Sequence, residues 1–167
     1  MPEKETLRRA EEDKEEGKAP STQAGEFVRE EMDHIREGKH GARSTKQAIA
    51  IGLSKARRAG VKLRAPKKGK ASSRTRKQAE RDLRKGAKKS GAKKTSSRRS
   101  RAVKQALQRE GRSAASHKSL SRQAKSAARK RSSADRSRAA KKAARTKGST
   151  GRKRAAKKAA RTRSRSR

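Results

Sequence analysis

Apolar side chains recur at helical spacing in the segment that follows Pro20. At 100° per residue, the apolar side chains of residues 22–38 lie within roughly 140° of arc and form one stripe. These side chains are Ala24, Phe27, Val28, Met32 and Ile35. Gly38 follows the last of them, and a glycine there is typical of a helix end. The pattern predicts an amphipathic helix over residues 22–38.

A second helix is indicated by its two ends. Ser44 and Gln47 have the spacing of a capping box, in which the serine side chain accepts from the backbone three residues later. Gly60 stands where a left-handed residue closes many helices, and Val61 can complete the hydrophobic contact of a Schellman motif. Together the two helices predict an αα-hairpin over residues 22–63. Its expected core consists of Phe27, Val28, Met32, Ile35, Ile49, Leu53, Val61 and Leu63.

The segments on either side of the hairpin have few apolar residues. Pro2 and Gly17 bound a stretch rich in Glu, Lys and Arg, which predicts a short, solvent-facing acidic helix over residues 3–16. Beyond Arg64 the composition narrows to Lys, Arg, Ala, Ser and Gly. Three weak helical windows remain there, the second of them capped by Ser100: residues 74–85, 101–110 and 119–131.

The composition of the chain leads to an expectation about its order. Hydrophobic residues make up 26% and charged residues 43% of its 167 residues, whereas globular chains have about 45–50% and about 25%. So little apolar surface cannot offset the conformational entropy that folding removes. We therefore expect a mostly α and largely disordered chain, with an acidic head and linker over 1–21, the hairpin over 22–63, and a disordered polycationic tail with transient helices over 64–167.

The charge of the chain restricts its partners. The formal net charge is +39, which divides into −4 over residues 1–40 and +43 over residues 41–167. Nucleic acid is the commonest polyanion in a cell, and anionic membranes and acidic proteins are the alternatives. The longest apolar run, AIAIGL, is too short for a membrane span, and the acidic N-terminal segment lacks the apolar region of a signal peptide. A cytoplasmic, nucleoid-associated protein is expected.

No pattern of residues indicates catalysis or a cofactor. The sequence has no Cys, no Walker loop and no dinucleotide fingerprint. Asp33, His34 and Glu37 are neighbours on the first hairpin helix, and we interpret them as an exposed charged face rather than a metal site. We expect no enzyme activity, no cofactor and no metal ion. Phe27 is the only aromatic residue, so the base stacking used by single-strand and RNA-binding modules is not expected.

Two parts of the chain resemble known proteins. Residues 26–63, and above all the stretch STKQAIAIGLSKARRAG, resemble an uncharacterised family of small basic bacterial and phage proteins, a domain of unknown function. The tail contains RAAKKAART twice, at 138–146 and 154–162, together with KKGK and AKKSGAKK. In these stretches it is similar to the tails of linker histones and bacterial histone-like proteins, although it lacks proline after Pro66. The second resemblance implies compaction of nucleic acid by charge.

The expected function is therefore non-specific binding of nucleic acid, most of all double-stranded DNA, through its phosphate backbone. Histone-like coating or compaction of a bacterial nucleoid would follow, and the tail is expected to gain helix on binding. The residues expected to contact phosphates are Lys46, Arg57, Arg58, Lys62, Arg64, Lys67 and Lys68 in and after the hairpin, and Arg138, Lys141, Lys142, Arg145, Arg154, Lys157, Lys158 and Arg161 in the tail.

Two alternatives stay open at this point. The chain could be an RNA-binding or ribosome-associated basic protein, because arginine can stack on bases in part. It could also be an interaction protein in which residues 22–63 self-associate or dock a protein partner, for example in plasmid maintenance, while the tail tethers the complex to nucleic acid. DNA is the first expected partner and RNA the second.

Overall fold

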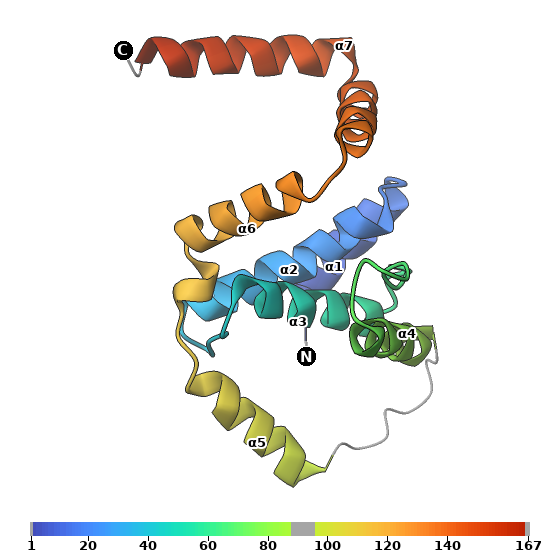
Figure 1. Ribbon diagram of the computed structural model, residues 1–167, viewed down its shortest axis with the longest axis vertical. Helices are drawn as coiled ribbons and strands as arrows, with labels where there is room; N and C mark the ends of the chain where they lie inside the picture. The colour runs from blue at the N-terminus through green and yellow to red at the C-terminus, as the bar shows by residue number, and fades with distance from the viewer. Residues whose placement is uncertain (1, 88–95, 166–167) are drawn as a thin grey trace. The chain divides into compact units, whose positions relative to one another are not determined.

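The computed structural model describes residues 2–87 and 96–165, and the regular elements in those residues are all helices (Figure 1). The chain divides into two compact units, Met1–Gln123 and Ala124–Arg167. Among the described residues, no helix combines the length and the apolarity that crossing a bilayer requires. In chain order the elements are α1 (Lys4–Glu15), α2 (Pro20–Arg36), α3 (Thr45–Arg58), α4 (Ser73–Ala87), α5 (Ser97–Gln108), the short 3-10 helix η1 (Ser113–Ala115), α6 (His117–Arg129) and α7 (Ser133–Arg165).

The ends of α3 follow the residues that predicted them. The Ser44 hydroxyl accepts a hydrogen bond from the Gln47 backbone at 3.3 Å, as expected for an N-cap. At the other end Gly60 has φ of +100°, a region that favours glycine. The Val61 amide donates to the Ala56 carbonyl and the Gly60 amide donates to Arg57, both at 3.1 Å. This is the bonding of a Schellman motif, so both predicted ends of α3 are confirmed.

The expectation of a largely disordered chain is wrong. Helices α4 to α7 occupy most of the expected tail, whereas residues 88–95 and 166–167 of that tail lie outside the described residues. Ala, Lys and Arg have high helix propensity, and no proline follows Pro66 to interrupt them. Even α7, which buries no described side chain, is helical on both sides of a break at Gly148. Its helical state therefore depends on local propensity and capping rather than on burial.

Serine side chains define where three of these tail helices begin. Ser72, Ser116 and Ser132 each accept a hydrogen bond from the backbone three residues later, at 3.2, 3.2 and 3.1 Å. Such bonds satisfy amides that the first turn of a helix leaves free. The cap predicted at Ser100 is wrong, because α5 begins at Ser97 and Ser100 lies inside it.

Helices α2 and α3 cross at close range, and a glycine permits that approach. A Cβ atom on Gly52 of α3 would lie 2.7 Å from the Val28 Cα of α2, closer than side-chain carbons come to backbone. Two apolar clusters form around this crossing. The first joins Met32, Ile35, Ala42, Ala48, Ala114 and Ala115 with Val28, Ile49 and Leu120; the second joins Ala10, Ala24, Phe27, Ala56 and Val61 with Leu53 and Leu63.

The first cluster includes residues that were expected to be disordered. The loop between α2 and α3 and the first residue of α3 bind the segment that runs from the end of α5 to η1 through three hydrogen bonds. The Gly41 amide donates to the Leu107 carbonyl at 2.8 Å, the Ala42 amide donates to Gly111 at 3.1 Å, and the Thr45 hydroxyl donates to Ala114 at 2.7 Å. The hairpin therefore does not complete its core alone, because a segment some seventy residues later along the chain contributes to it.

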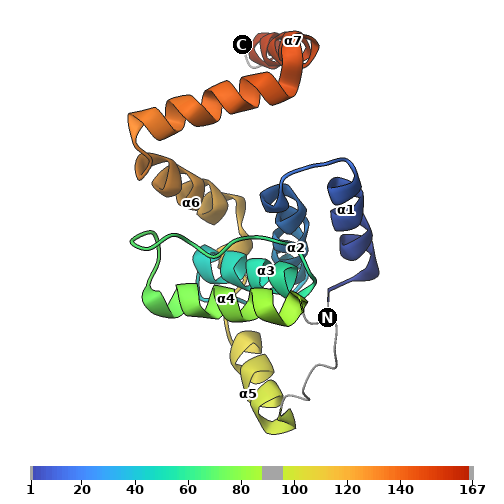
Figure 2. The same ribbon diagram turned by 90° about the vertical axis from the view of Figure 1, so that its right-hand side faces the viewer.

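Helix α4 runs beside α3 and is joined to it by a buried carboxylate (Figure 2). Asp82 is 1% exposed, and it accepts from the Ser54 hydroxyl and from Arg58 Nε, both at 2.7 Å. Burial alone would raise the pKa of Asp82. The hydrogen bonds from Ser54, Arg58 and Gln78, with the charge of Arg58, outweigh burial and lower that pKa below its usual value. The carboxylate therefore fixes which face of α4 meets α3 and which faces solvent.

We predict that the purified protein is already helical without nucleic acid. Far-ultraviolet circular dichroism in physiological salt should show roughly two thirds of the residues in helices, as the helix bounds require. Addition of duplex DNA should change this fraction little. A coil-like spectrum that becomes helical only with DNA would contradict the fold described here.

Replacement of Asp82 by alanine should destabilise the protein by roughly 1–3 kcal/mol, because Ser54 and Arg58 lose a buried acceptor. The matched control is Glu80→Ala, an exposed residue of the same helix, which should change the unfolding free energy by less than about 0.5 kcal/mol. Urea unfolding measures both.

The pH dependence of the same pair of variants has a defined sign. Because folding lowers the pKa of Asp82, its contribution is complete above the ordinary aspartate pKa of about 3.9 and is lost as the pH falls below it. The difference in stability between the natural protein and Asp82→Ala should therefore shrink in acid. A difference that stays constant from neutral pH down to acid would contradict the ionised state.

Candidate nucleic-acid interface

The basic residues predicted near the hairpin occupy two kinds of position. Lys46, in the first turn of α3, is exposed. So are the predicted residues of the extended segment between α3 and α4, where Gly69 turns the chain with φ of +82°. These are Lys62, Arg64, Lys67 and Lys68.

The two predicted arginines at the end of α3 bind within the fold. Arg57 is 7% exposed, and its Nε donates to the Leu63 carbonyl at 3.1 Å. Burial lowers the pKa of the Arg57 guanidinium, while the charge of Asp82 acts in the opposite direction. Arg58 forms the ion pair with Asp82 at 2.7 Å. Arg57 therefore joins the end of α3 to the segment after it, and Arg58 joins α3 to α4.

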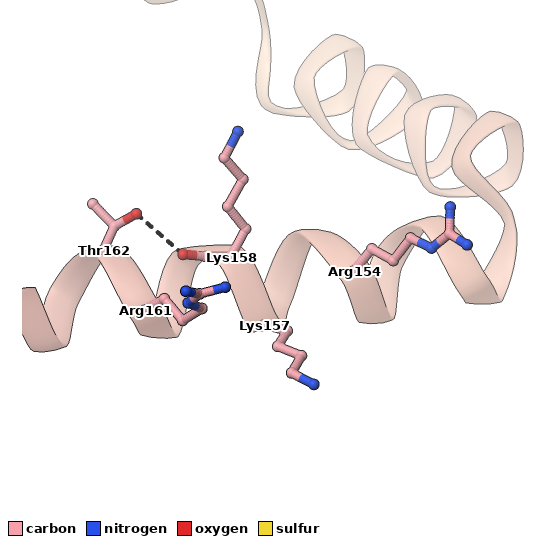
Figure 3. Close-up of a pocket in the computed structure, with 5 residues that line it drawn as sticks. All are labelled: Arg154, Lys157, Lys158, Arg161 and Thr162. Carbon is pink, nitrogen blue, oxygen red and sulfur yellow. Dashed lines mark hydrogen bonds between the residues drawn. The ribbon is translucent and has the colours of Figure 1, made fainter.

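The predicted tail residues lie on α7, one set on each side of its break at Gly148. In each copy of RAAKKAAR the four cations follow the spacing i, i+3, i+4 and i+7, so they share one face of a helix about 100° wide. All of them are exposed. Figure 3 shows the second set, which lines a shallow surface with Thr162; Lys157 and Lys158 diverge from the two edges of this face. The two sets are Arg138, Lys141, Lys142 and Arg145, and Arg154, Lys157, Lys158 and Arg161.

Helix α4 carries a similar basic face that the sequence analysis missed. Its segment RTRKQAER places Arg74, Lys77 and Arg81 at i, i+3 and i+7. These three side chains are exposed, and with Ser73 and Gln78 they line a second shallow surface. Because Asp82 and Ala79 face α3, the three cations are held toward solvent.

The same spacing recurs along the whole basic part of the chain. The pattern Arg-x-x-Lys-x-Ala occurs in six places, one for each of α3 to α6 and two in α7. In α3 the arginine precedes the N-cap, whereas in the other five copies both cations lie within the helix. The six Arg and Lys pairs are Arg43 and Lys46, Arg74 and Lys77, Arg101 and Lys104, Arg122 and Lys125, Arg138 and Lys141, and Arg154 and Lys157.

These twelve side chains are all exposed, and few acids lie near them. Of these twelve residues, all of them in the described part of the chain, only Arg138 forms an ion pair, with Asp135 at 2.6 Å. Like charges three residues apart on a helix repel each other, which costs a few tenths of a kcal/mol per pair. Only the two copies in α7 are identical over a longer stretch, RAAKKAART. The other four copies share the Arg-x-x-Lys-x-Ala spacing alone, which is why the repeat RAAKKAART did not reveal them.

The only Phe, Tyr or Trp side chain of this protein is buried. Phe27, the only aromatic residue, is 1% exposed and packs inside the second apolar cluster. No Phe, Tyr or Trp ring is therefore presented to a base, and the exposed cations are the main groups available to a nucleic acid.

The comparisons with known proteins describe part of the chain. Residues 21–68 match a family of unknown function, DUF6496, which confirms that the hairpin segment resembles an uncharacterised family. No curated protein and no solved structure matches the chain.

Proposed function

We propose that this protein binds the phosphate backbone of nucleic acid without sequence specificity, and duplex DNA before RNA. The observation that carries the proposal is the recurrence of exposed Arg and Lys pairs, one helical turn apart, on α3 to α7. An arginine and a lysine three residues apart are separated by about 4.5 Å along a helix axis. Duplex DNA carries one phosphate per about 3.4 Å of axis on each strand, so one pair can reach neighbouring phosphates of a strand.

The repulsion among these cations supports a polyanionic partner. In the free protein the like charges on each helix face oppose one another, and counterions in solution screen them. A nucleic acid supplies opposite charge at high density, and its own condensed counterions are released when cations bind it. Binding therefore relieves the repulsion that the unbound helices carry, and its strength should fall steeply as salt is added.

The absence of an exposed Phe, Tyr or Trp ring favours contact with the backbone over contact with the bases. Several cationic helices on one chain can contact more than one stretch of duplex. We therefore propose histone-like coating or compaction of DNA as the consequence, in a cytoplasmic, nucleoid-associated protein. Structured RNA is the competing ligand, and direct competition between duplex DNA and structured RNA distinguishes the two.

The basic face of α4 provides a direct test. The triple replacement Arg74→Gln, Lys77→Gln and Arg81→Gln removes three exposed cations and leaves Asp82 in place. Each lost phosphate contact should reduce the slope of log K against log salt by about 0.9, so the slope for duplex DNA should fall by about 2–3. Fluorescence anisotropy with a duplex oligonucleotide at several salt concentrations measures this slope.

A matched control removes the same charge elsewhere. Lys4, Lys14 and Arg29 are exposed residues of α1 and α2, and their replacement by glutamine should leave the slope nearly unchanged. A slope reduced equally by both triple variants would contradict a contact at α4 and would leave only a general effect of net charge.

A further inference from the structure

A cluster of histidines and carboxylates lies beside the first apolar cluster, away from the basic helix faces. Glu31 and His34 are three residues apart on α2 and therefore share one face, and His40 lies in the loop that follows. One ligand atom from each of these residues lies within 4.8 Å of the others. Glu31 is fully buried, and the side chains of His34 and His40 are only 13% and 17% exposed.

The hydrogen bond of His40 determines what its other nitrogen can do. His40 Nδ1 lies 3.1 Å from the Gly41 carbonyl oxygen, which can only accept, so Nδ1 carries the hydrogen. In the neutral ring Nε2 then presents a lone pair. That lone pair faces Glu31 Oε1 at 3.2 Å, another acceptor. Two acceptors at this distance repel each other, and a metal ion that binds both of them would remove the repulsion. A backbone carbonyl on the second nitrogen is the usual support of a metal-binding histidine.

Glu31 has one oxygen to spare for such a cation. Its Oε1 is buried and accepts no hydrogen bond. Lys55 Nζ lies 2.6 Å from Oε2 and balances one charge on that side, whereas Oε1 faces the imidazole of His40. A metal ion bound at Oε1 would leave this ion pair in place.

The wider surroundings of the cluster are acidic, in contrast to the rest of the chain. Glu3, which precedes α1, places Oε1 2.8 Å from His34 Nε2, and Glu30 Oε1 lies 3.8 Å from the same nitrogen. With both imidazoles neutral, the three carboxylates of Glu3, Glu30 and Glu31 exceed the two ammonium groups of Lys39 and Lys55 by one negative charge. A divalent cation is thus favoured here in a protein whose net charge is +39.

We propose that Glu31, His34 and His40 bind a divalent transition-metal ion of the zinc type. Two imidazoles and carboxylate oxygen form a donor set that zinc accepts in tetrahedral sites. The ion would join helix α2 to the loop that follows it. The expected role is structural, because metal binding to the folded state adds its free energy to stability. Asp33 and Glu37, the neighbours of His34 on α2, pair instead with Arg36 and Lys39.

The test uses full-length protein without a histidine tag, freed of nucleic acid and treated with a chelator before dialysis. Isothermal titration with zinc chloride at pH 7.5 should show one equivalent bound in the low micromolar range or tighter. His34→Ala and His40→Ala should each weaken binding by about tenfold or more. His117→Ala is the matched control, because His117 is exposed at the start of α6, and it should bind zinc like the natural protein.

A second measurement does not depend on the folding of any variant. One equivalent of cobalt(II) added to the natural protein should produce the intense visible absorption of a tetrahedral site, and zinc should abolish it. An absorption spectrum equal to that of aqueous cobalt, or zinc affinity equal in His40→Ala and His117→Ala, would overturn the proposal.

Discussion

The repulsion among the fifty-five Lys and Arg residues constrains how the helices of this protein can pack. Some of the few acidic residues pair with a cation of a neighbouring helix. Arg9 pairs with Glu26 between α1 and α2, Lys55 pairs with buried Glu31 between α3 and α2, and Arg58 pairs with buried Asp82 between α3 and α4. A buried carboxylate that loses its partner is costly, so these pairs fix how the helices meet. Among the described residues, exposed cations lie on the faces of α4 to α7 and in the segment between α3 and α4, and they are the basis of the proposed function.

Local signals in the sequence were sufficient to predict the hairpin. Ser44, Gln47 and Gly60 defined the ends of α3, because caps depend on residues three or four positions apart. The eight residues of the predicted core all belong to the two apolar clusters. What could not be predicted was the contribution of Ala114 and Ala115. Small side chains give no periodic signal, and the hydrogen bonds that bring them to the hairpin join residues far apart in the chain.

The expected disorder of the tail was wrong for a physical reason. The composition argument holds for chains that must bury apolar surface to become ordered. Helices such as α7 need little burial when they consist of Ala, Lys and Arg and begin at a serine cap. The serines that form the caps, Ser72, Ser116 and Ser132, are visible in the sequence, but too few apolar residues follow them to predict a stable helix from the apolar pattern.

The candidate interface was predictable in charge and only partly in position. The exposed cations of α7 and of the segment after α3 lie where the sequence placed them, in solvent. Arg57 and Arg58 are instead used to bind within the fold, which depends on Leu63 and Asp82 and on no local pattern. The histidine cluster was missed because the sequence grouped His34 with Asp33 and Glu37, its neighbours along the chain, whereas the loop determines the position of His40.

The most direct test of the central claim is competition between duplex DNA and structured RNA for the purified protein, measured by fluorescence anisotropy from about 50 to 300 mM salt. The account predicts that DNA binds at least as tightly as RNA and that log K falls steeply and linearly with log salt. A preference for RNA of tenfold or more, or an affinity that hardly responds to salt, would contradict it.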